Sequence, residues 1–298
     1  MLKGGSMMPN PSPLRYPGGK NRLANFIGIT IQNLGIPNCT YIEPFAGGAG
    51  VALSLLLSGT VENIIINDYD KAIYSFWRAV KQEPETLIQK ILDTPITIDE
   101  WYKQKTIYQT SAAYSLDLAF ATLFLNRTNH SGILNAGPIG GYSQSGDWKL
   151  DVRFDKKSII SKITTIAEHK SHITVYNKDI ISLLRNYAVH WGSNIFFYFD
   201  PPYYNKGQKL YKNFFTHYDH QRIRDVIVRE IGAPWIITYD DVPEIENLYD
   251  GFTIQKFDLT YSAANKGTAS ELIIFSDMQW CPTPKQLADN RITINLRS

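Results

Sequence analysis

The sequence has few of the features that mark secreted, metal-binding or membrane proteins. It contains two cysteines, Cys39 and Cys281, without a CxxC pair, and its six histidines are scattered. This pattern predicts two reduced thiols in a cytoplasmic protein and no zinc site. No apolar run approaches the ~18 residues of a membrane span. Residues 1–13 lack the apolar core of a secretory signal, so we expect a soluble intracellular protein whose first 13 residues are disordered.

A strong net charge is missing as well. The 30 Lys and Arg residues against 28 Asp and Glu residues leave a formal charge of +2. That balance neither requires nor excludes nucleic acid, because a local basic groove can exist in a nearly neutral protein. There is no GKS/T and no GxGxxG motif, which argues against a P-loop. With 298 residues and 44% hydrophobic content, the chain can form one large α/β domain with an insertion, or two modest domains.

Short apolar segments that alternate with amphipathic stretches are the main organisational signal. The predicted strands are residues 40–45, 63–68, 173–179, 194–200 and 234–241, followed by a hairpin pair at 252–262 and 271–277. Helices are expected at 51–57 and from about Lys71. This alternation predicts an α/β fold with a mostly parallel sheet that is covered on both faces.

The alternation stops between about Gln82 and Lys170. This segment is mainly helical in pattern and then opens into a long stretch rich in Gly, Ser and Asn, residues 127–148. We interpret 82–170 as an inserted helical subdomain, with 14–81 and 171–298 forming the main domain.

A glycine-rich turn follows the first predicted strand. Gly47, Gly48 and Gly50 let the backbone turn tightly and approach a ligand closely. The next strand ends in Asp68, a carboxylate well placed to accept both hydroxyls of a ribose. Together they favour a nucleoside-containing cofactor across the strand ends. The alternative is a packing turn beside a solvated Asp.

The strand at 194–200 ends in the unusual sequence DPPY. Its two prolines remove two backbone donors, so the corner offers acceptors, the Asp200 carboxylate and the Pro201 carbonyl. An exocyclic amine has two N–H donors that this pair could bind, and Tyr203 could stack on the base at ~1–3 kcal/mol. The alternative is a rigid turn with the tyrosine packed beneath it.

These segments, taken in order, resemble a known family. RYPGGK (15–20), EPFAGGAG (43–50), IIINDYD (64–70) and DPPY (200–203) have the order and spacing of the Dam-type, α-class N6-adenine methyltransferases of DNA. FLNRTNHSGI (124–133) and ELIIF (271–275) resemble two further family segments. The resemblance extends over nearly the whole chain.

The resemblance implies a Rossmann-like sheet for S-adenosyl-L-methionine (SAM), with an antiparallel final strand and a helical target-recognition insertion. It implies SAM as cofactor, S-adenosyl-L-homocysteine as product, and methyl transfer to the N6 amine of an adenine flipped out of a specific sequence in double-stranded DNA. It also implies a cytoplasmic, nucleoid-associated enzyme, and it is compatible with a cognate restriction endonuclease as partner. The oligomeric state stays open.

The family's site roles can be carried over by position. The implied catalytic residues are Asp200, Pro201, Pro202 and Tyr203. The implied cofactor residues are Tyr16, Gly18, Lys20, Glu43, Phe45, Ala46, Gly47, Gly48, Asp68, Asp179 and Ile180. In this scheme Asp200 and Pro201 make the adenine amine a better nucleophile, and no metal or covalent protein intermediate is needed.

DNA contacts are expected from three places. The candidates are Arg127, His130, Ser131 and Asn135 in the insertion, Lys206 and Lys209 after DPPY, and Asn265 and Lys266 between the last two strands. The alternatives are a solvated loop for the lysines and a plain hairpin turn for the last pair. Dam-type enzymes have an aromatic residue, an Asn and then an Arg where this chain has His130, Ser131 and Asn135, so GATC is not the expected target. Other residues of this loop, Tyr142, Gln144 or Trp148, could supply the base contacts instead.

Three other functions remain open from the residues. An RNA adenine or a protein amide could be the acceptor, although protein-glutamine methyltransferases prefer Asn where this chain has Asp200. A catalytically silent DNA-binding regulator could keep the same fold, but the intact DPPY motif, glycine-rich turn and Asp68 disfavour it.

Overall fold

A seven-stranded sheet forms the centre of the protein. The computed structural model describes residues 10–15, 20, 23–205, 215–260, 268–290, 292, 294 and 296. The strands, in spatial order β3-β2-β1-β4-β5-β7-β6, are β3 (Ile173–Tyr176), β2 (Asn63–Asn67), β1 (Thr40–Glu43), β4 (Ile195–Phe199), β5 (Trp235–Asp240), β7 (Thr268–Phe275) and β6 (Thr253–Thr260). The first five are parallel, and β7 runs antiparallel between β5 and β6. The expected mostly parallel sheet with a terminal hairpin is confirmed.

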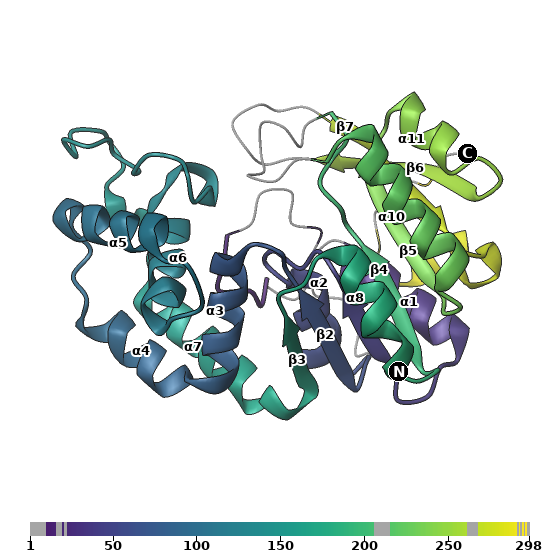
Figure 1. The fold of residues 1–298 in the computed structure, drawn as a ribbon, viewed down its shortest axis with the longest axis horizontal. Helices are drawn as coiled ribbons and strands as arrows, with labels where there is room; N and C mark the ends of the chain where they lie inside the picture. The colour runs from purple at the N-terminus through teal and green to yellow at the C-terminus, as the bar shows by residue number, and fades with distance from the viewer. Residues whose placement is uncertain are drawn as a thin grey trace.

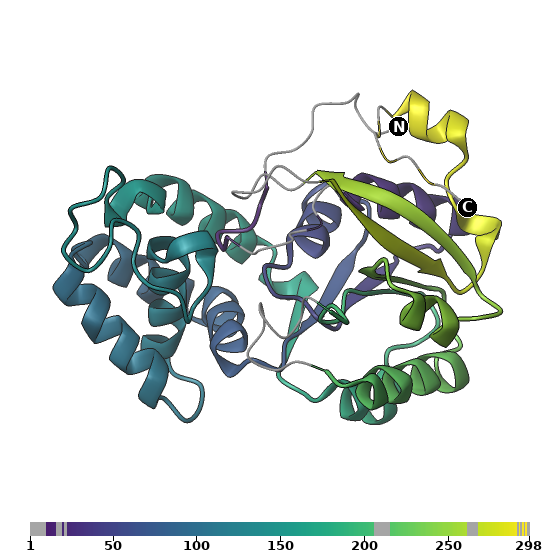
Figure 2. The ribbon, with the colours of Figure 1, turned by 90° about the horizontal axis from the view of Figure 1, so that it is seen from above.

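Helices cover both faces of the sheet, as Figures 1 and 2 show. One face packs against α1 (Leu23–Leu34), α2 (Gly50–Leu57) and α3 (Lys71–Gln82). The other face packs against α8 (Ile180–Asn186), α10 (His217–Glu230) and α11 (Pro243–Leu248). Because β4 is buried along its whole length, both faces of the central strand need apolar side chains. The run IFFYF supplies them.

The segment after α3 forms a group of helices beside the sheet (Figure 1). It contains α4 (Pro84–Asp93), α5 (Ile98–Thr110), α6 (Leu116–Thr128) and α7 (Lys156–Glu168), with short 3-10 turns at η1 (His130–Gly132) and η2 (Leu150–Arg153). Nearly all of α6 is buried, and it packs against α3 and α5. The hydrophobic core is continuous from the sheet through α3 into α6. The helical segment is therefore attached to the sheet by packing as well as by the chain.

Short elements complete the chain. These are η3 (Lys170–His172), η4 (Ala188–His190), η5 (Met278–Trp280) and α12 (Pro284–Asp289). Cys39 and Cys281 are free thiols. No helix in the described part of the chain has the length and apolar character to cross a bilayer.

Two expectations about boundaries need correction. The predicted strands extend slightly too far at their carboxyl ends. The last strand residues are Glu43, Asn67, Tyr176, Phe199 and Asp240, and the residues after them belong to loops.

The predicted disorder of residues 1–13 also extends too far. Ser12 and Leu14 are buried, and Lys162 of α7 donates a hydrogen bond from Nζ to the Ser12 carbonyl at 3.1 Å. This packing comes from a helix distant in sequence, so local composition does not indicate it. Residues 1–9 lie outside the described part.

Candidate active site

Four carboxylates lie where parallel strands end. Glu43 ends β1, Asp68 follows β2, Asp200 follows β4 and Asp240 ends β5. Since the carboxyl ends of parallel strands meet at one edge of a sheet, this edge is the expected ligand crevice of an open α/β fold. Sequence reasoning singled out three of the four and missed Asp240, although TYDD also follows an apolar run.

The glycine-rich turn is bonded directly to Asp68. The backbone N–H of Gly47 donates to Asp68 Oδ2 at 2.9 Å, and Trp77 of α3 donates from Nε1 to the Gly47 carbonyl at 2.9 Å. Gly47 has φ 45° and Ala49 φ 48°, so the chain passes through left-handed conformations immediately before α2. The turn is thus held in one shape from both sides.

Asp68 is half-buried and accepts one backbone N–H on each oxygen. Its Oδ1 accepts from Asp70 at 2.9 Å, in addition to the bond from Gly47. Burial raises the pKa of Asp68 to about 7. Each carboxylate oxygen has a second lone pair, so the group can still accept two further hydrogen bonds.

Glu43 is buried beside the same turn. Its Oε2 accepts the backbone N–H of Ala52 in α2 at 3.0 Å, and burial raises its pKa to about 8. At neutral pH this carboxyl group mostly keeps its proton. Its neighbours Ala46 and Gly48 are buried, and Phe45 packs edge-on against Phe215 with ring centroids 6.1 Å apart.

Asp200 has donors on one of its two oxygens. Its Oδ1 accepts from Thr238 Oγ1 at 2.9 Å and pairs with Lys20 Nζ at 3.1 Å. No described residue donates to Oδ2 in the structure. Burial raises the pKa of Asp200, and the neighbouring Lys20 charge opposes that rise. Pro201 is buried and Pro202 is half-buried, and neither contributes an N–H.

Tyr203 is packed beneath the corner. Its ring is 5% exposed, its hydroxyl donates to Glu271 Oε1 at 2.5 Å, and the Lys20 ammonium lies 5.3 Å from the ring centroid. This placement corresponds to the alternative given for the sequence, in which the tyrosine packs beneath a rigid turn. Stacking of a base on Tyr203 requires the ring to become uncovered, and it stays a prediction.

Asp240 holds the chain that leaves the corner. Its Oδ1 accepts the Tyr204 N–H at 2.8 Å and its Oδ2 accepts the Asn205 N–H at 3.0 Å. Lys20 lies at this corner, where its ammonium bridges Asp200 and Glu271. Sequence reasoning included Glu271 only as part of ELIIF, although an acidic residue beginning an apolar run is a recognisable signal.

Asp179 and Ile180 begin α8 after β3. Asp179 is exposed and caps the helix, since its Oδ1 accepts the N–H groups of Ile181 at 3.0 Å and Ser182 at 3.2 Å. Ile180 is buried. Both are near the carboxyl end of β3, on the same side as the other strand ends.

Asn126 joins the insertion to the first sequence motif. Its Oδ1 accepts the Arg15 N–H and its Nδ2 donates to the Arg15 carbonyl, both at 2.7 Å. The same amide donates to the Gly132 carbonyl at 2.9 Å. Neighbouring Arg127 is half-buried, and burial with nearby Arg15 lowers its pKa to about 10. Its Nε has no hydrogen-bond acceptor within the described ranges.

The loop after α6 is built to expose polar side chains. His130, Ser131 and Asn135 are exposed. Ser131 has φ 55° and Gly132 φ 76°, and a Cβ on Gly132 would lie 2.5 Å from the Arg15 carbonyl oxygen. Further along, Tyr142 is 60% and Trp148 69% exposed. These five side chains therefore reach solvent from a shaped loop, whereas the Gln144 amide is hydrogen-bonded within the loop.

Several candidates lie outside the described residues. They are Tyr16, Gly18, Lys206, Lys209, Asn265 and Lys266. Their expected roles stay predictions.

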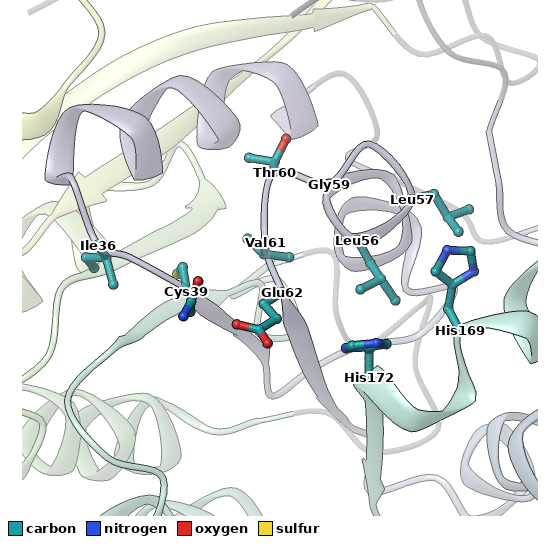
Figure 3. A pocket seen from close by; sticks show the side chains of 11 residues that line it. Ile36, Cys39, Leu56, Leu57, Gly59, Thr60, Val61, Glu62, His169 and His172 are labelled. Atoms are coloured by element: carbon teal, nitrogen blue, oxygen red, sulfur yellow. The ribbon is translucent and has the colours of Figure 1, made fainter. Parts of the chain in front are cut away.

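A separate hollow lies at the opposite edge of the sheet. It has a volume of about 480 Å³, and Figure 3 shows its lining. Cys39, Glu62 and His172 line it and directly precede β1, β2 and β3. It is therefore at the amino ends of the strands and is no part of the candidate active site.

Comparisons with known proteins agree with the order of the sequence motifs. The model of the D12 class N6 adenine-specific DNA methyltransferase family matches residues 16–263. The chain is 22% identical over 275 residues to the type II methyltransferase M.MjaIII of Methanocaldococcus jannaschii, covering 82% of this chain and 89% of that protein. It is 21% identical over 255 residues to the type II methyltransferase M1.LlaDCHI of Lactococcus lactis subsp. cremoris, covering 78% and 85%.

Among solved structures, the chain resembles the rRNA methyltransferase aviRa from Streptomyces viridochromogenes. The TM-score is 0.42 and the identity 13%, over 88% of this chain and 86% of that one. The fold assignment rests on the strand order, and the family assignment on a match that spans most of the chain and includes both the glycine-rich turn and DPPY. The chain belongs to the D12 class of N6 adenine-specific DNA methyltransferases.

Proposed function

We propose that Asp200 Oδ2 and the Pro201 carbonyl accept the two N–H groups of an adenine 6-amine that has been flipped out of double-stranded DNA. The observation that supports this most is the one-sided use of the Asp200 carboxylate. Thr238 and Lys20 both contact Oδ1, so Oδ2 can still accept a hydrogen bond at the ligand edge of the sheet. Flipping costs a few kcal/mol, which contacts in the pocket must offset.

The family implies SAM, and the residues of the glycine-rich edge fit it. We propose that Asp68 accepts the ribose hydroxyls, since its half-buried carboxylate retains a lone pair on each oxygen. Glu43 and the turn from Phe45 to Gly48 would line the cofactor's methionine and ribose part. The adenine part would lie by Asp179 and Ile180, and Tyr16, Gly18 and Lys20 would complete the site. Bound SAM would supply an electrophilic methyl group and, with the methyl–sulfur bond broken, would leave as S-adenosyl-L-homocysteine.

The protein's part in the reaction is positioning and charge. The adenine amine is a poor nucleophile because its lone pair is delocalised into the ring. Hydrogen bonds to Asp200 Oδ2 and the Pro201 carbonyl favour a more tetrahedral nitrogen with an available lone pair. As N6 gains its bond to carbon it loses a proton, and Asp200 Oδ2 is the proposed acceptor. Burial raises the pKa of Asp200, which makes it a better base than an exposed Asp.

The insertion is the proposed target-recognition part. Arg127 and the exposed residues His130, Ser131 and Asn135 lie on α6 and the loop after it. Lys206, Lys209, Asn265 and Lys266 are further proposed contacts. Because the sequence of this loop differs from that of Dam-type enzymes, the proposed DNA target is a sequence other than GATC. Both curated relatives are named type II methyltransferases, and a cognate restriction endonuclease is a proposed partner.

Methylation mapping tests this function. The protein is expressed in a host without DNA methylation, beside an Asp200→Ala variant, and N6-methyladenine is mapped by single-molecule sequencing. We expect one consistent motif with the wild type. With purified protein, the variant should lose ~10²–10³-fold in turnover while SAM binding measured by calorimetry persists.

Three results would contradict the proposal. Near-normal turnover of Asp200→Ala would remove Asp200 from the mechanism. Methylation of RNA or single-stranded DNA in preference to duplex DNA would show that duplex DNA is not the substrate. A wild type that does not bind SAM would indicate a silent DNA-binding protein.

A further inference from the structure

A buried glutamate on β7, Glu271, contacts Tyr203 of DPPY and Lys20. Glu271 is 1% exposed and lies opposite Asp240 of β5 and Phe257 of β6. Its Oε1 accepts the Tyr203 hydroxyl at 2.5 Å, and its Oε2 accepts from Lys20 Nζ at 2.5 Å. One carboxylate thus connects three segments that are far apart in sequence.

Lys20 is divided between two carboxylates. The residue is 4% exposed, so its ammonium needs charged partners inside the protein. Its Nζ lies 2.5 Å from Glu271 Oε2 and 3.1 Å from Asp200 Oδ1. The closer partner is Glu271, which leaves Asp200 only partly neutralised.

We propose that Glu271 is a positioning residue for methyl transfer, which holds Lys20 against Oδ1 of Asp200 and keeps Oδ2 free as the acceptor for the substrate amine. The inference rests on the proposed function of Asp200. Without the Glu271 charge, Lys20 would pair with Asp200 alone. Asp200 would then be a weaker hydrogen-bond acceptor and a weaker base.

The charges around Asp200 give this role a distinctive pH signature. Glu271 raises the pKa of Asp200, whereas Lys20 lowers it. The other ionisable groups that face Asp200 are Glu43 and Tyr41 of β1, Tyr198 of β4 and Tyr239 of β5. Turnover needs ionised Asp200. The acid limb of the pH profile of kcat, where activity falls as the pH is lowered, therefore follows the pKa of Asp200. Removing the Glu271 charge should move the limb to lower pH, and removing the Lys20 charge should move it to higher pH.

The test compares Glu271→Gln, Lys20→Gln and a control, Ser276→Ala, which removes a hydrogen bond from Trp235 N–H just after β7. Duplex DNA methylation is measured across pH, with SAM affinity by calorimetry and thermal unfolding for each variant. For Glu271→Gln we expect kcat reduced ~10-fold or more, SAM affinity within ~3-fold, and the acid limb at lower pH. The acid limb of Lys20→Gln should move the opposite way, and that of Ser276→Ala should stay in place.

Two results would overturn the inference while leaving the proposed function intact. One is Glu271→Gln with wild-type kcat and acid limb. The other is a reduced kcat with an unmoved acid limb, which indicates a structural role alone. If Glu271→Gln does not fold, Glu271→Asp replaces it. This variant keeps the charge one methylene farther back, so kcat should fall and the acid limb should move to lower pH by less than expected for Glu271→Gln, and a wild-type kcat or an unmoved limb would overturn the inference. A wild type that transfers no methyl group to DNA would overturn both proposals.

Discussion

At the scale of single residues, the carboxylates of the sheet edge have different environments although they occupy equivalent strand ends. Burial raises the pKa of Glu43 to about 8 and that of Asp68 to about 7, while Asp200 shares a buried lysine with Glu271. Near neutral pH, Glu43 is therefore mostly protonated, and Asp68 is close to its midpoint. The two groups proposed to line the same cofactor differ in charge.

The midpoint of Asp68 predicts that cofactor binding depends on pH. Ribose hydroxyls donate more strongly to an ionised carboxylate than to a protonated one. SAM affinity should therefore rise with pH through about 7, by about 3- to 10-fold between about pH 6 and about pH 8. Calorimetry at both values measures this change.

Substitution of Asp68 checks the source of the pH effect. Asp68→Asn should bind SAM more weakly and with little pH dependence. Asp93→Asn, a change of an exposed acid on α4, should behave as the wild type. Equal wild-type affinities at the two pH values would exclude Asp68 as the titrating ligand group.

At the scale of elements, α6 connects the proposed recognition loop to the sheet edge that carries the proposed catalytic residues. Its buried face packs on α3, whose Trp77 holds the glycine-rich turn, and its last turn carries Asn126 and Arg127. Asn126 binds both backbone groups of Arg15, which belongs to the same sequence motif as Lys20. The insertion thereby contributes to the shape of the active-site edge.

Loss of the Asn126 amide should be costly. Asn126→Ala leaves the Arg15 N–H and carbonyl without these partners, and buried unsatisfied groups cost about 1–3 kcal/mol each. We expect the free energy of unfolding, measured in urea, to fall by at least about 1–3 kcal/mol.

A matched change on α4 serves as the control for Asn126. Gln89 donates an exposed side-chain hydrogen bond to Asp93 at 2.8 Å. Gln89→Ala should change stability by less than about 0.5 kcal/mol. If Asn126→Ala were no more destabilised than Gln89→Ala, the Asn126 bonds would not be a structural link.

At the scale of the whole molecule, one continuous core joins the sheet and the helical insertion. The exposed loop after α6 and the carboxylate edge are therefore parts of one packed body. Figure 1 places the insertion helices to one side of the sheet. A duplex that is recognised by the insertion and whose flipped adenine binds at Asp200 would need to contact both the insertion and the carboxylate edge of the sheet.

Arg127 provides a test of that arrangement. Arg127→Met keeps the aliphatic stem and removes the charge. We expect weaker duplex binding and a salt slope reduced by about 1, with SAM affinity unchanged. Fluorescence anisotropy over a salt series measures both. Arg229→Met, at the far end of α10, should leave the slope as in the wild type. An unchanged slope for Arg127→Met would show that Arg127 contacts no phosphate.

The residues that end the apolar runs are recognisable from the sequence by itself. Asp68 and Asp200 follow buried parallel strands, and strand polarity alone brings such ends to one edge. The glycine-rich turn and DPPY are also local signals, because glycine frees the backbone and proline restricts it where each residue stands. The order of these motifs is enough to indicate the family.

The pairing between distant segments depends on the folded chain. Lys20 and Glu271 are 251 residues apart, and Arg15 and Asn126 are 111 apart. Periodicity indicates which side chains are buried, but not which strand becomes the neighbour of another. Insertion of β7 between β5 and β6 is what places Glu271 beneath Tyr203 and beside Lys20. The partners of a buried charge are set by sheet order, which is a property of the tertiary fold.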